Sequence, residues 1–285
     1  MEAAFAEMPL ALFTTLAPIG AGAFIALAAA FCAGSMTEEQ SRATFKMTTI
    51  PVVVLLVGFA ASFFHLASPL NAPSVLAGIG RSPLSNEIAV GSIFVIVALV
   101  FWILGLLGKL GEGARKGFAV VVAVLAVVFA VFTGMAYMMG TIVSWNTPLT
   151  SIEILGAALL GGALLGSGVL ALAKADNFEG AHTARSVMFM LGLVGFVAAA
   201  VAAFGHAEYV AGLVSGIVAG ADLLAPAVPY LMGALVLGIV AVACLGAASF
   251  GKSSAPMALV GAVLAIAAQL LVRLAFYACQ MSVGL

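Results

Sequence analysis

The chain has 285 residues, of which only 10 are Lys or Arg and 11 are Asp or Glu, and 65% are hydrophobic. A soluble domain of this length would carry about 70 charged side chains, so a soluble globular fold is excluded, because too much apolar surface would face water. The net charge of −1 offers no basic surface for nucleic acid. We therefore expect an all-α polytopic membrane protein that forms a single domain over residues 1–285.

Apolar runs separated by polar or Gly/Pro-rich stretches predict eight transmembrane helices, since a spanning helix needs about 20 apolar residues. Their expected ranges are 9–35, 46–67, 87–108, 116–140, 150–173, 185–204, 228–250 and 255–282. We expect the first to be a retained helix and not a signal peptide, because Glu2 and Glu7 stand where a signal would be basic. The stretch 208–224 is Gly-rich and short, which favours an interfacial or re-entrant piece over a ninth span.

Basic residues gather on alternate connections. With eight helices, one face of the membrane receives eight of the ten Lys and Arg residues: Arg42, Lys46, Lys109, Arg115, Lys116, Lys174, Arg185 and Lys252. The connections on the other face carry only Arg81, and Arg273 lies inside the last helix. The positive-inside rule then predicts that the basic face is cytoplasmic and that both termini are extracytoplasmic.

Polar residues at membrane depth are costly and usually mark function. Gly58, Ser62 and His65 have the spacing of one helix face, and the imidazole could accept a proton from a bound hydroxyl. The alternative is an interfacial histidine bonded to backbone or headgroups. Glu87 opens the third predicted helix, either as a first-turn carboxylate with Ser85 as N-cap or as a proton acceptor between a buried site and outside water.

A cation inside a span needs a partner or a water-filled site. Arg273 shares one face of the last helix with Gln269 and Tyr277. Its side chain could hold a ligand oxygen, form an ion pair with Glu87 or Glu153, or extend outward to the membrane surface.

The remaining histidines, aromatics and cysteines suggest no redox centre. Haem would need two histidines at matching depth, and His206 is expected beyond its span, facing water, so we expect no haem. His182 is expected to be a solvated loop residue, and Tyr137 and Trp145 fit the aromatic belt of the membrane interface. The cysteines (Cys32, Cys244 and Cys279) form no C-x-x-C pair, so neither an iron–sulfur cluster nor another metal site is expected.

Several stretches resemble a known family. Residues 58–69, GFAASFFHLASP, followed by RSPLSNE at 81–87, resemble the signature of the dimethyl sulfoxide reductase membrane-anchor subunits. Met135-Ala136-Tyr137 with WNTPLT at 145–150 is similar to the central pattern of that family. RLAFY at 273–277 with MSVGL at 281–285 resembles its C-terminus, so the similarity covers nearly the whole chain.

The resemblance implies an anchor of the bacterial or archaeal cytoplasmic (inner) membrane that binds menaquinol at the outer edge and serves anaerobic respiration. Its expected partners are a four-cluster iron–sulfur subunit and a molybdopterin catalytic subunit, both on the extracytoplasmic side. It also implies His65 and Glu87 as the catalytic pair of the quinol site. We add Gly58, Ser62, Arg273 and Tyr277 as expected quinol-binding residues.

No catalytic activity is expected from the isolated chain. Because the catalytic partner sets the terminal acceptor, the alternative is a related complex that reduces another N- or S-oxide, polysulfide or tetrathionate. A small-solute transporter is the less favoured interpretation, since the polar groups cluster at one membrane edge and not at the midplane.

Overall fold

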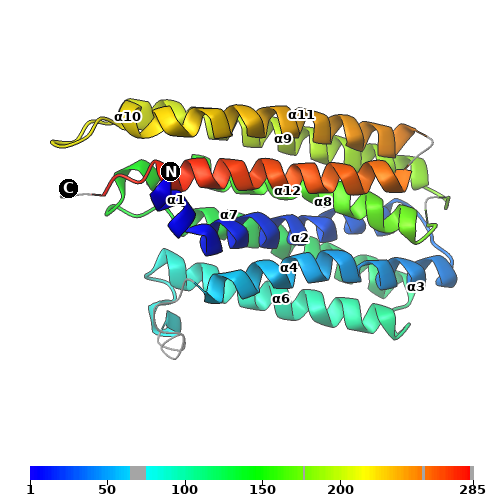
Figure 1. The fold of residues 1–285 in the computed structure, drawn as a ribbon. Coiled ribbons are helices and arrows are strands. Elements are labelled where there is room, and N and C mark those ends of the chain that lie inside the picture. The colour runs from blue at the N-terminus through cyan, green and yellow to red at the C-terminus, as the bar shows by residue number, and fades with distance from the viewer. Residues whose placement is uncertain (65–74, 176, 252–253, 283–285) are drawn as a thin grey trace.

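The structure, a computed structural model, describes residues 1–64, 75–175, 177–251 and 254–282 (Figure 1). The described residues form helices with two isolated β-bridges, Ile142–Ser282 and Val214–Ala219. The helices are α1 (Glu2–Ala6), α2 (Met8–Ala33), α3 (Glu38–Met47), α4 (Thr49–Phe63), η2 (Leu76–Gly78), α6 (Pro83–Leu106), α7 (Glu112–Met135), η3 (Val143–Trp145), α8 (Leu149–Leu172), α9 (Ala181–Ala211), α10 (Gly220–Leu224), η4 (Ala225–Ala227), α11 (Val228–Phe250) and α12 (Ser254–Ala278).

Eight helical segments of the described residues are long and apolar enough to cross a membrane, as the sequence predicts. Two of the eight are composite: α3 continues into α4, and α10 continues through η4 into α11. The stretch 208–224 makes no ninth span within the described residues. Its first part extends α9 to Ala211, and its last part is α10, with a short turn closed by the Val214–Ala219 bridge between them.

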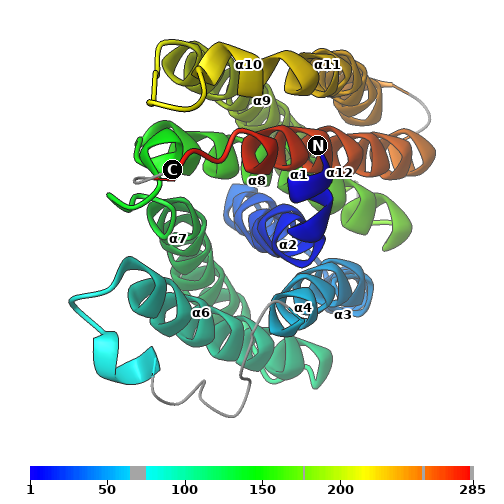
Figure 2. The same cartoon turned by 60° about the vertical axis from the view of Figure 1, so that its left-hand side comes forward.

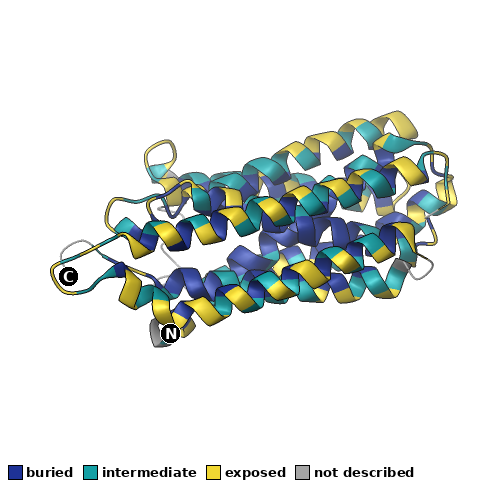
Figure 3. Cartoon of the chain, turned by 90° about the horizontal axis from the view of Figure 1, so that it is seen from above, coloured by how far each residue is buried: buried dark blue, intermediate teal, exposed yellow. Residues whose placement is uncertain are grey.

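Two helices form the centre of the bundle. In α2 and α8, 72% and 78% of an apolar 18-residue stretch is buried inside the bundle. In the other six spanning segments the buried share of such a stretch is 28% to 39%. Figure 2 shows α4, α6 and α7 on one side of this central pair and α9, α11 and α12 on the other. Along the outer helices the exposed residues form outward stripes (Figure 3). These stripes are apolar, with Ile96, Val124 and Val201 among their exposed side chains, as expected for surfaces that face lipid.

Small residues allow α2 and α8 to touch. A Cβ atom on Gly22 would lie 1.8 Å from the carbonyl oxygen of Ala158, and one on Gly162 would lie 2.1 Å from the carbonyl carbon of Gly22. Helices in lipid gain little from hydrophobic burial against each other, so close backbone packing supplies much of their association. This contact fixes the two helices that carry Thr14 and Glu153.

The two ends of the bundle differ in composition. The N-terminus and residue 282 lie at the same end, here called the terminal end (Figure 1). The opposite end, here called the basic end, is formed by the α2–α3, α6–α7, α8–α9 and α11–α12 connections and their flanking turns. It carries seven of the described basic residues: Arg42, Lys46, Lys109, Arg115, Lys116, Lys174 and Arg185.

Candidate functional site

Arg273 is the centre of a buried polar cluster at the terminal end. Its side chain is fully buried, and each guanidinium nitrogen has its own partner. Nε donates to the Thr14 hydroxyl of α2 at 3.0 Å, Nη2 donates to the Tyr277 hydroxyl at 3.4 Å, and Nη1 forms an ion pair with Glu153 of α8 at 3.3 Å. Of the partners predicted from sequence, the structure therefore selects Glu153.

Aromatic rings enclose the guanidinium. Its carbon lies 4.1 Å from the ring centroid of Phe276 and 5.0 Å from that of Tyr137. The Tyr137 and Tyr277 hydroxyls are hydrogen-bonded at 2.5 Å. Burial, reinforced by Tyr277, raises the pKa of the Tyr137 phenol well above its usual value, so this group remains a neutral hydrogen-bonding partner. We call Thr14, Tyr137, Glu153, Arg273 and Tyr277 the arginine cluster.

The prediction that Tyr137 and Trp145 belong to an aromatic belt is wrong. Both side chains are buried, and the Trp145 ring stacks on Phe276 with a centroid distance of 5.2 Å. The Trp145 indole donates to the Phe276 carbonyl oxygen at 3.3 Å. An inward partner for the indole N–H removes the usual reason for a tryptophan to remain at the headgroups.

Glu87 lies on the inward face of α6 and is 5% exposed. Its Oε1 has no hydrogen-bond partner among the described residues, and the Thr133 side chain and the Arg273 charge act on the carboxyl. The prediction that Ser85 caps this helix is wrong, because α6 starts at Pro83 and the Ser82 hydroxyl accepts from the Ser85 amide. Glu87 is therefore a full turn inside the helix, where dipole stabilisation is weaker.

Aromatic side chains fill the next turns of the bundle beside Glu87. Gly91 follows Glu87 by four residues on the same face, and a Cβ atom there would lie 3.1 Å from the Phe129 ring. Phe129 stacks on Phe59 and on Phe94, each with a centroid distance of 5.4 Å. The Glu87 carboxyl therefore stands beside a set of stacked rings.

The other predicted site residues lie on or after α4. Gly58 packs against α2, since a Cβ atom there would lie 2.5 Å from the backbone nitrogen of Ala17. Ser62 is half-buried and donates to the Phe59 carbonyl oxygen at 2.7 Å. His65 lies outside the described residues.

Sequence reasoning missed the place of His206. It was expected beyond its span and in water, but α9 continues to Ala211 and the ring is only 9% exposed. Its Nε2 lies 2.8 Å from the carbonyl oxygen of Ser144. A carbonyl oxygen only accepts, so Nε2 carries the proton. The apolar residues on both sides of His206 were the available signal that the helix does not stop at residue 204.

The types of side chain that meet at the terminal end limit the chemistry that is available there. Among the described residues, no three His, Cys, Asp or Glu side chains gather in a metal-binding group, and the three cysteines are free thiols. The arrangement around Arg273 and Glu87 instead brings together carboxyls, phenols and one guanidinium. These groups can accept or donate protons and hydrogen bonds.

Comparison with known proteins gives a consistent result. Residues 1–279 match the family described as DMSO reductase anchor subunit (DmsC). The C subunit of the anaerobic dimethyl sulfoxide reductase of Escherichia coli (strain K12) is 30% identical over 289 residues, covering 100% of this chain and 99% of that protein. The YnfH subunit of anaerobic dimethyl sulfoxide reductase from the same organism is 29% identical over 191 residues, covering 67% of each protein.

The corresponding C subunit of Haemophilus influenzae (strain ATCC 51907 / DSM 11121 / KW20 / Rd) is 32% identical over 152 residues, which are 53% of this chain and 54% of the relative. The family match over nearly the full length confirms the resemblance seen in the sequence. The chain belongs to the DMSO reductase anchor subunit family, and it is an integral membrane subunit of an oxidoreductase complex.

Proposed function

We propose that this subunit binds and oxidises menaquinol at the outer side of the cytoplasmic membrane of a bacterium or archaeon. The electrons pass to a four-cluster iron–sulfur subunit and from there to a molybdopterin subunit that reduces dimethyl sulfoxide or a related oxide. The observation that carries this proposal is that the buried carboxyls Glu87 and Glu153 gather with the buried Arg273 at the terminal end. In our proposal the terminal end is extracytoplasmic, in agreement with the seven cations at the opposite end.

The proposed chemistry is the loss of two electrons and two O–H protons from a hydroquinone. His65 and Glu87 receive or hydrogen-bond these protons, since a carboxyl with an unpartnered buried oxygen is ready to bond a hydroxyl. The stacked Phe59 and Phe129 rings beside Glu87 provide an aromatic surface suited to a flat headgroup.

In this proposal the arginine cluster holds a positive charge in a fixed position beside the quinol. Arg273 is held on three sides by Thr14, Glu153 and Tyr277, so its charge is fixed near the carboxyl of Glu87. A fixed positive charge favours the developing charge on a quinol oxygen without reorganisation at the moment of reaction. Gly58 sets the distance between α4 and α2, and with it the position of Ser62 on α4.

The test uses the whole complex, assembled in membranes, with a soluble menaquinol analogue as donor and dimethyl sulfoxide as acceptor. We expect His65→Ala and Glu87→Gln to reduce the rate of quinol oxidation by about 10²-fold or more, the range typical of a lost general base. The matched control is His182→Ala, because His182 is an exposed histidine at the basic end. Assembled His65→Ala and Glu87→Gln complexes that oxidise the analogue at the wild-type rate would refute the proposed site.

A further inference from the structure

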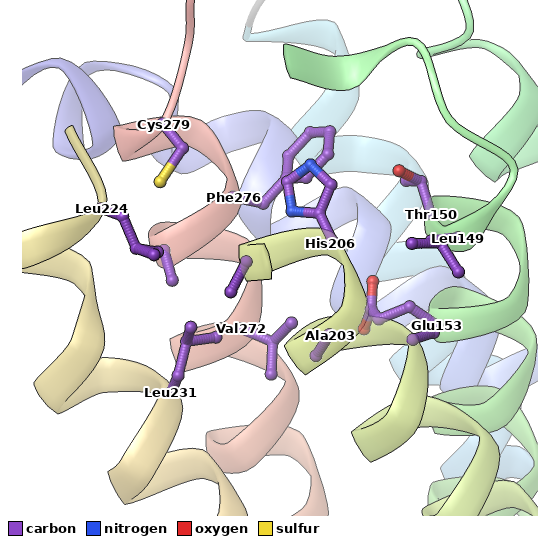
Figure 4. Close-up of a pocket in the computed structure, with 13 residues that line it drawn as sticks. Leu149, Thr150, Glu153, Ala203, His206, Leu224, Leu231, Val272, Phe276 and Cys279 are labelled. Atoms are coloured by element: carbon purple, nitrogen blue, oxygen red, sulfur yellow. The ribbon is translucent and has the colours of Figure 1, made fainter. Parts of the chain in front are cut away.

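A small pocket lies at the terminal end, beside the arginine cluster (Figure 4). Its walls come from α8, α9, α10, α11 and α12 and from Cys279 just after α12, and none of the residues that line it belongs to α4, α6 or α7. The pocket is therefore separate from the helices that carry Glu87 and the aromatic stack. Glu153, which pairs with Arg273, is one of its lining residues.

Two buried polar atoms in the walls have no hydrogen bond within 3.5 Å among the described residues: Oε1 of Glu153 and Oγ1 of Thr150. The buried amide of Gln269 on α12 faces the Glu153 carboxyl, and its Nε2 also lacks such a bond. The Glu153 and Thr150 side chains are 4% and 2% exposed, and they share one face of α8 because they are three residues apart. Thr150 is the second residue of α8, so its hydroxyl has no helical carbonyl four residues earlier to bond. An unpartnered buried polar atom is costly, which favours a bound partner for both atoms.

His206 supplies a third polar group to the same pocket. Since its Nε2–H is used by the Ser144 carbonyl oxygen, a neutral ring leaves Nδ1 as a hydrogen-bond acceptor. Figure 4 shows the imidazole, the Thr150 hydroxyl and the Glu153 carboxyl on the walls of this pocket. The pocket thus presents two acceptors and one hydroxyl that can either donate or accept.

The size of the pocket limits what it can hold. The volume of the pocket that the centre of a water molecule can occupy is about 20 Å³. One ordered water needs about 10–15 Å³ by the same measure and two to four polar partners. The pocket therefore has the room for a single water, and its walls carry three polar groups.

We propose that this pocket binds a water molecule between Glu153, Thr150 and His206, and that this water carries one of the two protons of quinol oxidation out on the α8–α9 side. This inference rests on the proposed function. One O–H proton leaves on the Glu87 side, and the second passes through Glu153 and the water toward the terminal end. The two electrons go to the iron–sulfur cluster of the partner subunit.

Several ionisable groups surround the path and would influence its pH dependence. From α12, Arg273 and the uncharged amide of Gln269 face Glu153. Tyr277 and Tyr137 lie against the Arg273 guanidinium, and Glu87 on α6 interacts with the same charge. On α9, Tyr209 packs beside His206, and after α12 the Cys279 thiol lines the pocket. In the pocket wall, α10 and α11 contribute only Leu224 and Leu231.

The first experiment compares Thr150→Val with Thr15→Val in the assembled complex. Thr15 is a matched control: its hydroxyl is also buried without a partner among the described residues, but it lies on α2 and does not line the pocket. We expect Thr150→Val to slow quinol oxidation by about tenfold and to change its pH profile and solvent deuterium isotope effect. Thr150→Ser should restore the wild-type values, because it returns the hydroxyl, and Thr15→Val should leave them unchanged.

The second measurement is a cryo-EM map of the wild-type complex at a resolution that shows ordered waters. A peak within hydrogen-bonding distance of Glu153 Oε1 and Thr150 Oγ1 is the expected result, and an empty pocket overturns the proposal whatever the kinetics show. The proposal also fails if Thr150→Val matches Thr15→Val, or if Thr150→Ser is as slow as Thr150→Val. A wild-type complex that oxidises menaquinol while Thr150→Val is unaffected refutes the water path and leaves the proposed function standing.

Discussion

Each end of the bundle holds a buried arginine, and the two are balanced in different ways. At the basic end, Arg115 donates to the Ser41 hydroxyl at 2.8 Å, and its nearest carboxylate, Glu38, is 3.9 Å away and 71% exposed. At the terminal end, Arg273 pairs with Glu153 at 3.3 Å, and the two side chains are 0% and 5% exposed. The carboxylate beside Arg115 is thus in solvent, whereas the carboxylate that pairs with Arg273 is buried with it.

In our proposal this difference separates an end that serves structure from an end that serves chemistry. A carboxylate at the surface costs little to keep charged and contributes little to stability. A buried ion pair carries a large desolvation cost, and its partners depend strongly on each other. Such a pair in a membrane protein is a reason to expect function nearby. We therefore expect substitutions at the two ends to have unequal effects.

The largest expected effect is that of Arg273→Met. Removal of the guanidinium leaves Glu153 charged and unpaired in the interior, so we expect a loss of about 3–5 kcal/mol of stability. The measurement is the thermal unfolding of the purified anchor in detergent, followed by size-exclusion chromatography. The double variant Arg273→Met/Glu153→Leu should recover most of the loss, because neither charge is left alone. A single variant as stable as the wild type would contradict the buried ion pair.

The second-largest expected effect is a loss of quinol-oxidation rate in Glu87→Gln. Glu87→Gln keeps the shape of a side chain that has no ion-pair partner among the described residues, so the melting temperature should stay near that of the wild type. Quinol oxidation should fall by about 10²-fold, as expected for a lost proton acceptor. Glu38→Gln at the basic end is the control and should leave the rate unchanged. Equal rates for Glu87→Gln and Glu38→Gln would remove the functional difference between the two ends.

Arg115→Met should have a smaller effect on stability than Arg273→Met. Its hydroxyl partner and exposed carboxylate suggest a loss of about 1 kcal/mol. The same unfolding assay compares the two variants directly. If Arg115→Met destabilises the protein as strongly as Arg273→Met, the proposed difference between the two ends does not hold.

The smallest effect is expected from Gly117→Ala near the basic end. A Cβ atom at Gly117 in α7 would meet nothing within 4 Å, so alanine should stabilise the helix by about 0.5–1 kcal/mol. Gly140→Ala is the control: it has the same open surroundings but lies outside a helix, so we expect little change. A destabilised Gly117→Ala variant would indicate a neighbour that packs on this face.

The sequence predicted the helices better than it predicted their ends. The end of α9 is an example, because the predicted helix stops at residue 204 and the observed one continues to Ala211. His206 and Glu208 are polar residues that suggest a loop, but in the fold the His206 ring is hydrogen-bonded to the Ser144 carbonyl oxygen. Trp145 was misplaced for a similar reason. An amphipathic ring near the end of a span suits both the interface and the interior, and only a partner such as Phe276 decides between them.

For the candidate site, the sequence identified Glu87, Arg273 and Tyr277 as polar groups in an apolar chain. It offered no sign that Thr14 would be a partner of Arg273, because a threonine in an apolar helix usually bonds its own backbone. Thr14 does both: its hydroxyl donates to the Leu10 carbonyl oxygen at 2.8 Å and accepts from Arg273. The Thr150–Glu153–His206 pocket was also missed, since α8 and α9 contribute its polar groups from positions more than 50 residues apart in the sequence.

By itself, the sequence determined the membrane class and the eight spans, because bilayer thickness and the scarcity of charge leave few other arrangements for 285 residues. Its motifs, and not its composition, indicated the family. Only the tertiary structure decided which carboxylate neutralises Arg273, and which buried groups line the small pocket beside it. The physical reason is that hydropathy acts along the sequence, whereas charge pairing and cavity shape depend on helices that meet in space. The scarcity of charged residues therefore indicates a membrane protein, and the fold decides which of these charges meet.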